Sequence, residues 1–498
     1  MTIKTQIQQF DLLLEGRITP ALSGKYFDAI DPSNGDIIAR LADADTVDVE
    51  IAVNAARLGF DHGGWPRLSV TERGAFLKKI GKLIREHAKE LAELECGATG
   101  KTIKHATFID VPTCAETFEH YGGSFENLLC ETINVDAPVL SQIEHEPIGV
   151  VAAIIPWNYP LIMTAWKLAP ALLAGNTVIL KTSQWASASI MYLAKLIASV
   201  GLPKGVVNII TSNHEGIGKY LVSHRDVDMI SFTGSTKTGE QVMTVSSKGI
   251  KRSIMELGGK SANIVFADCD MDAAIGGSLS AIFLNQGQMC TAGSRLLVQE
   301  KIYKEFIDNF VKRAKTLKIG PADSFETEFG PLVSLEHRDA ILKFIEQGVQ
   351  EGAKLVCGGK IPDGLNPKGA YLEPTIFMDV RNNMRIAQEE AFGPVLCIIP
   401  FSSLEQAVAI ANDSKYGLAA MVWSKDILKA NTVARRLRCG TVWINTYGVF
   451  LNEAPFGGYK QSGYGRELGK DGLYAYTQTK HVLTDQTPGG KSLVTSWF

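Results

Sequence analysis

One cysteine lies in a polar, glycine-flanked loop and is the first candidate for covalent chemistry. Cys290 stands in NQGQMCTAGSR at residues 285–295, between a helical pattern and an apolar run at residues 296–298. Loops held by a rigid scaffold often carry nucleophiles, and a cysteine acts as one once its thiolate is favoured. The alternative is a buried structural thiol, which is how we interpret the other cysteines of the chain. The loop by itself leaves both interpretations open.

Two polar side chains at predicted strand ends could assist such a nucleophile. Glu256, in MELGGK, precedes a glycine pair and is predicted to face a cleft at a sheet edge, rather than to be a solvated surface charge. Asn158 follows the apolar run 150–155 in PWNYP, and an amide at such a turn can donate to an oxyanion. The preference of asparagine for turns explains Asn158 equally well. No histidine occurs in these segments, so a Cys–His hydrolase pair is not indicated.

A nucleotide site is indicated only weakly by the glycines. Neither GxGxxG after the first predicted strands nor a P-loop occurs. FTGSTKTG, residues 232–239, follows a predicted strand and opens a predicted helix, whose first N–H groups can hold a pyrophosphate. Small residues at a strand-to-helix turn more often serve only the turn.

The helical and strand patterns around these residues predict an α/β fold. After a helical region at 45–105, short apolar runs alternate with helical patterns, as in parallel sheets covered on both faces. The predicted strands are 150–155, 177–181, 206–210, 229–232, 262–266, 296–298, 354–356, 395–399 and 441–444, and the helices between them include 190–200, 303–317, 338–349 and 404–411. We expect two such units, one ending near residue 258 and one from 259 to the 450s. Residues 130–146 alternate without a following helix, as a separate strand pair would, and the extended segment 474–484 could pair with it.

Composition excludes several classes of protein. The net charge of -3 argues against nucleic-acid binding, which needs clustered positive charge. The longest apolar run, residues 148–155, is far short of the about 20 residues that span a bilayer, and no secretory signal is visible. No CxxC pair or zinc-spaced cluster occurs, so we expect no metal site. Scattered thiols without a signal peptide predict a cytoplasmic protein.

Seven segments, taken in order, resemble the aldehyde dehydrogenase superfamily: PWNYP, LKTSQ, FTGSTKTG, MELGGK, NQGQMCTAGSR, EEAFGPV and PFGGYKQSGYGRE. The resemblance runs from about residue 10 to residue 484. It implies an α/β fold with two doubly wound, Rossmann-like domains and a small β bridge that forms a homodimer or homotetramer. The expected limits are 1–128 and 148–258 for the NAD(P)-binding domain, 259–457 for the catalytic domain, and 129–147 with 471–498 for the oligomerisation strands and tail.

The resemblance also implies a reaction, the oxidation of a small-molecule aldehyde to the acid with NAD or NADP and water. Cys290 resembles the nucleophile that forms a thiohemiacetal and then a thioester. The side-chain amide of Asn158 and the N–H of Cys290 would stabilise the oxyanion. Glu256 resembles the base that activates water, and Lys167 and Glu467 match positions proposed to relay protons to it.

Cofactor contacts are implied in the same way. Lys181 resembles the residue on the adenosine ribose, Ser235 the one near the pyrophosphate, and Glu390 the carboxylate on the nicotinamide ribose. The full implied set is Ile154, Pro156, Trp157, Lys181, Ser183, Gln184, Phe232, Gly234, Ser235, Leu257, Glu390 and Phe392. Gln184 departs from the glutamate usual in NAD-preferring members and removes its negative charge, so we expect NADP to be accepted alongside NAD.

The residues that match the family's substrate funnel are Tyr159, Ile162, Met163, Trp166, Leu284, Met289, Thr291, Gly448, Val449, Phe450 and Phe456. No Arg or Lys is among them to pair a second carboxylate, and Gly448 stands where the family often has an acid. We therefore expect neutral, medium-sized aliphatic, terpenoid or aromatic aldehydes. An aromatic cage of Tyr159 and Trp166 could instead hold a cation. The C-terminal KSLVTSWF resembles the tails of the betaine-aldehyde-dehydrogenase-like branch.

Two other interpretations keep the fold and change the function. In CoA-acylating relatives CoA takes the acyl group, but such members generally lack the glutamate that matches Glu256. A binding protein derived from this fold would be expected to have lost Cys290 or Glu256, and the chain has both.

Overall fold

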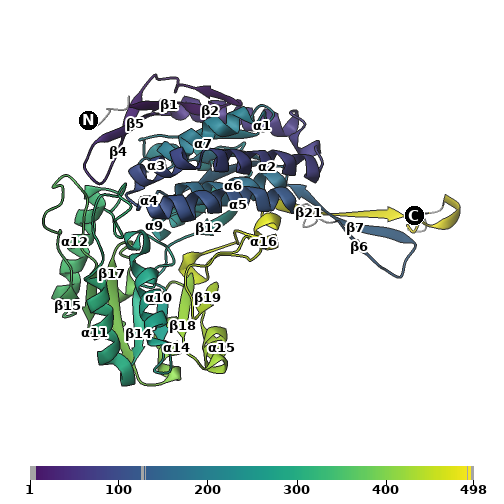
Figure 1. Cartoon of the computed structure of the whole chain (residues 1–498). Coiled ribbons are helices and arrows are strands. Elements are labelled where there is room, and N and C mark those ends of the chain that lie inside the picture. Colours follow the sequence, from purple (N-terminus) through teal and green to yellow (C-terminus); the bar gives the residue numbers. More distant parts are fainter. Residues whose placement is uncertain (1–6, 125–127, 129, 491, 495–498) are drawn as a thin grey trace.

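The computed structural model describes residues 7–124, 128, 130–490 and 492–494. Residues 1–6, 125–127, 129, 491 and 495–498 lie outside the described part, and with them most of the tail on which the betaine-branch resemblance rests. Two large sheets, each covered by helices, form the body, and a narrow strand arm projects from it (Figure 1).

The first sheet has eight strands in the order β20-β12-β11-β8-β9-β10-β2-β3. Its central strands run parallel and are almost wholly buried, which explains their continuous apolar sequences. They are β8 Val150–Ile154, β9 Thr177–Lys181, β10 Val207–Ile210, β11 Met229–Thr233 and β12 Arg252–Glu256. Antiparallel strands complete the edges, β2 Leu12–Leu14 with β3 Arg17–Thr19 on one side and β20 Gly463–Tyr464 on the other.

Helices of this sheet start at clear capping signals. α1 begins after Asp45 and α2 after Ser69, each with a capping box that satisfies the free N–H groups of the first turn. α6 starts at a proline and is buried along nearly its whole length, since it lies between the sheet and α5. The helices are α1 Thr46–Asp61, α2 Val70–Glu86, α3 Ala88–Thr99, α4 Ile103–His105, α5 Val111–Gly123, α6 Pro160–Leu173, α7 Ala188–Ser199, α8 Gly216–Ser223 and α9 Thr236–Ser247.

The second sheet has seven strands in the order β15-β16-β17-β14-β13-β18-β19, all parallel except the edge strand β15. Its strands are β13 Ala262–Val265, β14 Arg295–Gln299, β15 Lys354–Cys357, β16 Thr375–Met378, β17 Val395–Phe401, β18 Ala419–Trp423 and β19 Thr441–Ile444. Its helices are α10 Met271–Phe283, α11 Tyr303–Ala314, α12 Leu335–Gln350, α13 Arg385–Gln388, α14 Leu404–Asn412 and α15 Ile427–Arg436. The predicted α/β class with two parallel sheets is confirmed.

The strand arm consists of β6 Glu131–Ile133, β7 Val139–Pro147 and β21 Thr477–Asp485, in the order β21-β7-β6. β7 and β21 pair antiparallel over their full lengths, so the pairing expected between these distant segments is confirmed. The arm extends away from the body in Figure 1. A further small sheet joins β1 Gln8–Phe10, β5 Ile37–Ala42 and β4 Tyr26–Ile30. The domain limits themselves stay a prediction.

The return of the chain from the second sheet to the first matters for the site. After β19 the chain leaves the second sheet and adds β20 to the first, where Gly463 pairs with Glu256. It then passes Glu467 and enters α16 Gly469–Tyr474 before β21. The final segment thereby contributes to the first sheet, which the sequence patterns did not indicate.

Candidate active site

The Cys290 loop, which runs from the end of α10 into β14, has an uncommon backbone. Asn285 and Gln286 have φ of 49° and 55°, in the left-handed region that non-glycine residues seldom enter. The side chain of Asn285 fixes the turn, because its Nδ2 donates to the backbone oxygens of Asn158 at 3.2 Å and of Gln288 at 3.3 Å. Asn158 Nδ2 in turn donates to the Gln288 oxygen at 2.9 Å. Asn158, the predicted oxyanion donor, is therefore hydrogen-bonded to the turn that directly precedes Cys290, the predicted nucleophile.

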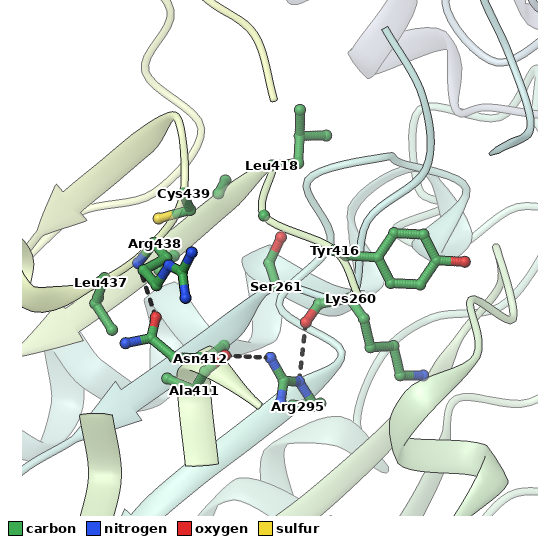
Figure 2. Close-up of a pocket in the computed structure, with 14 residues that line it drawn as sticks. Lys260, Ser261, Arg295, Ala411, Asn412, Tyr416, Leu418, Leu437, Arg438 and Cys439 are labelled. Atoms are coloured by element: carbon green, nitrogen blue, oxygen red, sulfur yellow. Dashed lines mark hydrogen bonds between the residues drawn. The ribbon is translucent and has the colours of Figure 1, made fainter. Parts of the chain in front are cut away.

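Arg295 anchors the other end of this loop. Its buried guanidinium donates to the backbone oxygens of Lys260 at 2.9 Å, Ile410 at 2.9 Å and Ala411 at 2.8 Å, and to Asn382 Oδ1 at 3.0 Å. Figure 2 shows this side chain reaching the Lys260 and Ala411 oxygens. The pocket beside it holds only about 20 Å³, room for about one water. This region therefore braces the cysteine loop and is too small for a substrate or cofactor.

Two larger cavities meet at Cys290. One has a volume of about 570 Å³ and lies at the carboxyl ends of β8, β9, β11 and β12, where nucleotides bind in open α/β sheets. The other has a volume of about 260 Å³. Cys290 lines both, together with Tyr159, Met163, Thr233 and Leu257. A group on its sulfur can therefore face a ligand in either cavity.

The larger cavity contains every residue predicted for the cofactor, namely Ile154, Pro156, Trp157, Lys181, Ser183, Gln184, Phe232, Gly234, Ser235, Leu257, Glu390 and Phe392. Ser235 caps α9 by accepting from Thr238 N at 3.2 Å, so the first turn of this helix opens into the cavity with its positive end. A volume of this size and a helix N-terminus both fit a dinucleotide.

Glu390 is held at the edge of this cavity by the glycine pair of MELGGK. Its Oε1 accepts from Gly259 N at 3.0 Å, and a Cβ at Gly258 would lie 2.0 Å from Glu390 Oε2, so only glycine fits there. Burial raises the pKa of the Glu390 carboxyl to about 7, although the hydrogen bond from Gly259 N–H and the charges of Lys260 and Lys415 act to lower it. A carboxyl held in this way can accept hydrogen bonds from ribose hydroxyls.

Trp157, His337 and Phe392 form an aromatic cluster at the larger cavity, and His337 was not predicted from the sequence. His337, from α12, hydrogen-bonds the Phe392 backbone oxygen through Nε2 at 2.9 Å. The ring of Trp157 lies 5.2 Å from both His337 and Phe392 in edge-to-face geometry. Burial lowers the pKa of His337, so a neutral imidazole supports Phe392 beside the cavity.

The smaller cavity contains every residue predicted for the substrate funnel, namely Tyr159, Ile162, Met163, Trp166, Leu284, Met289, Thr291, Gly448, Val449, Phe450 and Phe456. In its aromatic wall the ring of Trp166 lies 5.7 Å from that of Phe450, edge to face, and 5.4 Å from that of Phe456, in a tilted arrangement. His105, Ile109 and Thr113 also line it. His105 is the last residue of α4, Ile109 lies between α4 and α5, and Thr113 lies in the first turn of α5. None of the three was predicted from the sequence.

Glu256 lies at the inner end of this cavity, where β12 ends and the returning chain brings Glu467 close. Both Glu256 oxygens are enclosed and have no hydrogen-bond partner among the described residues. Burial, followed by the charge of Glu467, raises the pKa of Glu256 well above its usual value, whereas Lys167 and Arg466 lower it. Lys167 forms a buried ion pair with Glu467 and donates to Ser231 Oγ at 3.1 Å. The predicted base and relay residues are thus brought together.

The Cys290 thiol is protonated in this setting. Burial, together with the charges of Glu390 and Glu256, raises its pKa to about 12. The backbone N–H groups of Thr291 and Cys290 act in the opposite direction. Attack by this sulfur therefore requires a base that removes its proton.

Two negative findings concern the described part of the chain. No group of three or more His, Cys, Asp and Glu side chains there is arranged to hold a metal ion. None of the helices there combines the length and apolarity needed to cross a membrane.

Known proteins resemble this chain in sequence and in fold. A model of the aldehyde dehydrogenase family matches residues 18–482. The betaine aldehyde dehydrogenase of Bacillus subtilis (strain 168) is 45% identical over 489 residues, which cover 98% of this chain and 99% of that protein. The mitochondrial aldehyde dehydrogenase of Sus scrofa is 44% identical over 464 residues, covering 93% and 88% respectively.

Solved structures agree with the sequence relatives. The NAD⁺ complex of an aldehyde dehydrogenase from Bacillus cereus superposes with a TM-score of 0.94 at 41% identity, over 96% of this chain and 97% of that one. The family match over nearly the whole chain, the sequence relatives and the NAD⁺-bound structure lead to one conclusion: this chain belongs to the aldehyde dehydrogenase family and is an aldehyde dehydrogenase that uses NAD or NADP.

Proposed function

We propose that the chain oxidises aldehydes to carboxylic acids through a thioester on Cys290. The observation that carries this proposal is the place of Cys290 at the junction of the two cavities, with Asn158 beside it and Glu256 lining the smaller one. The sulfur adds to the carbonyl carbon, giving a thiohemiacetal. NAD(P)⁺ held in the larger cavity would supply the hydride acceptor needed for oxidation of the adduct to a thioester. Water then cleaves the thioester, which releases the acid and restores the thiol.

Asn158 is suited to hold the oxygen of the thiohemiacetal. Its Nδ2 carries two hydrogens, and the Gln288 backbone oxygen accepts one of them at 2.9 Å. That bond fixes the amide plane and leaves the second hydrogen for an oxyanion on a substrate bound to Cys290. A donor fixed before the reaction stabilises developing charge at no cost in reorganisation.

Glu256 is suited to remove protons from the Cys290 thiol and from water. No described residue hydrogen-bonds its enclosed oxygens and competes with substrate protons, and its raised pKa makes the carboxylate a stronger base. The buried pair of Lys167 and Glu467 offers a path for the proton that Glu256 takes up. This base also supports hydrolysis rather than acyl transfer to CoA.

The preferred aldehydes are neutral and of medium size. Among the described residues, no Arg or Lys lines the smaller cavity, and the only carboxyls that line it, Glu256 and Glu467, belong to the proposed proton path. The predicted cage of Tyr159 and Trp166 is compromised as a cation site, because the Lys101 ammonium already lies 4.1 Å from the Tyr159 ring centroid. A second cation near that ring would meet this positive charge as well as the π-face.

A panel of aldehydes tests this substrate class. We expect hexanal and benzaldehyde to have kcat/KM values at least tenfold above those of succinic semialdehyde and of betaine aldehyde, because burying an unpaired charge in an apolar cavity is costly. The measurement is cofactor reduction at 340 nm under steady-state conditions. Preference for betaine aldehyde, the substrate named for the Bacillus subtilis relative, would show that the aromatic cage works despite Lys101.

Gln184 is expected to allow NADP alongside NAD. It lines the cofactor cavity with Lys181 and Ser183, which could contact a 2′-phosphate as a cation and a donor. In Gln184→Glu the new charge should repel that phosphate and depress NADP use by tenfold or more, about 1.4 kcal/mol, while NAD use stays nearly constant. Gln350→Glu, which adds the same charge at the exposed far end of α12, should change neither. A wild-type enzyme that rejects NADP by a thousandfold contradicts this role of Gln184.

We also propose that the strand arm joins subunits. Most side chains of β21 are exposed, and Ile133, Val135 and Leu483 present apolar surface to solvent in a single chain. A second copy covering the arm would bury these side chains and pair its open strand edges.

A further inference from the structure

A buried charged cluster lies directly behind the wall of the substrate cavity. Lys101 Nζ lies 2.6 Å from Asp110 Oδ2 and 3.5 Å from Glu95 Oε1, and all three side chains are fully enclosed. The mechanism proposed above uses none of these groups. Buried charges are costly unless they are paired and hydrogen-bonded. This cluster also contacts the cavity wall, because Lys101 Nζ lies over the ring of Tyr159.

A single π-turn links this cluster to the cavity. Residues Ala106–Asp110 form one turn with an i→i+5 hydrogen bond, between α4 and α5. In such a turn residues five apart come together, and His105 and Asp110 are related in this way. His105 Nε2 lies 3.5 Å from Asp110 Oδ1, and the His105 ring lines the substrate cavity. Interruptions of this kind in a helix occur frequently at functional sites.

The charges around His105 favour one of its two tautomers. Burial raises the pKa of Asp110, whereas the short bond from Lys101 acts to lower it and favours the carboxylate. His105 Nε2 lies 3.5 Å from Asp110 Oδ1, and neither atom has a hydrogen-bond partner among the described residues, so the contact is electrostatic. A carboxylate attracts an N–H and repels a nitrogen lone pair, so this contact orients the ring with the proton on Nε2 and leaves Nδ1 as the acceptor. Burial, with the Lys101 charge, lowers the pKa of His105 well below its usual value, so the ring stays neutral at physiological pH.

We propose that His105, oriented by Asp110, is a specificity residue of the substrate cavity and that the preferred aldehydes carry a hydroxyl group distal to the carbonyl. This inference rests on the proposed oxidation of neutral aldehydes. The hydroxyl donates to Nδ1 of His105 inside an otherwise largely apolar cavity. An ammonium group could donate to the same nitrogen, but the nearby Lys101 charge favours the neutral hydroxyl. A site that hydrogen-bonds a substrate hydroxyl discriminates against the analogue that lacks it.

Two nearly isosteric substrates test the proposal, 4-(hydroxymethyl)benzaldehyde and 4-methylbenzaldehyde. We expect wild-type kcat/KM to be about tenfold higher for the hydroxymethyl compound, mainly through KM, because a distal contact acts on binding. In His105→Phe the ratio of the two kcat/KM values should fall to about one, while 4-methylbenzaldehyde is still oxidised. Thr113→Val removes a hydroxyl from the same wall and should leave the ratio unchanged.

The outcomes separate this proposal from the function on which it rests. Equal wild-type kcat/KM values for the two compounds overturn the role of His105 and leave aldehyde oxidation intact, whether or not the variants fold. Loss of the ratio in Thr113→Val, but not in His105→Phe, also overturns it. Clear preference for 4-(dimethylaminomethyl)benzaldehyde, which brings a charged N–H donor, contradicts the neutral hydroxyl. Failure of both neutral compounds beside rapid turnover of betaine aldehyde instead overturns the proposed substrate class.

Discussion

Replacing Cys290 by alanine is expected to abolish aldehyde oxidation while NAD(P) binding survives. The thiohemiacetal and the thioester both require the sulfur, and no other described cysteine lines either cavity. Loss of a covalent step of this kind costs several orders of magnitude in rate. The rate is measured by cofactor reduction at 340 nm. Cofactor binding is measured by quenching of tryptophan fluorescence, since Trp157 and Trp185 line the larger cavity.

Cys357→Ala is the matched control for this variant. Cys357 is also half-buried, but it lies on the edge strand β15, away from both cavities. Its replacement should leave both activity and cofactor binding near the wild-type values. If Cys290→Ala keeps more than about a tenth of the activity, a change below roughly 1.4 kcal/mol, the sulfur is not the nucleophile.

Most central strands of both sheets could be predicted from the sequence because they are buried on both faces. Among the predicted strands, Thr177–Lys181 and Thr441–Ile444 have the predicted limits, and the others differ by a few residues at most. The strands β16 and β18 were missed although they are also buried, and β12 was predicted only as a strand that ends at Glu256. The short strands β2, β3 and β20 escaped prediction, since each has only two or three residues and pairs at a sheet edge. Nothing in so short a segment shows which distant strand it joins.

The residues of the candidate site that stand in contiguous sequence motifs could be predicted. Cys290, Glu256 and Asn158 stand in segments whose glycines and prolines mark strand ends, and the structure places them around connected cavities. His105 and His337 gave no such signal. His105 lines its cavity because of a π-turn, and His337 lines its cavity because α12 packs there. Neither arrangement follows from a local sequence pattern.

Replacing Glu256 by glutamine should slow both halves of the reaction, because the Cys290 thiol and the water lose the same base, and we expect thioester hydrolysis to become the slower half. The amide has the size of the carboxyl group but cannot take a proton from water, so thioester hydrolysis should fall by about 10²–10⁴-fold. One equivalent of reduced cofactor per active site should then form in a burst, and the acyl-enzyme should accumulate. Intact-protein mass spectrometry measures this as a mass increase by one acyl group on Cys290.

The pH dependence distinguishes loss of the base from a general disturbance of the site. Burial and the charge of Glu467 raise the pKa of Glu256, and only its ionised form accepts a proton, so wild-type deacylation should rise with pH through this raised pKa. Glu256→Gln should remove the rise. Glu467→Gln takes away the like charge and should therefore move the rise to lower pH, while hydrolysis continues at a reduced rate because the proton path through Glu467 is lost. If Glu256→Gln turns over normally and keeps the wild-type pH profile, another group activates the water.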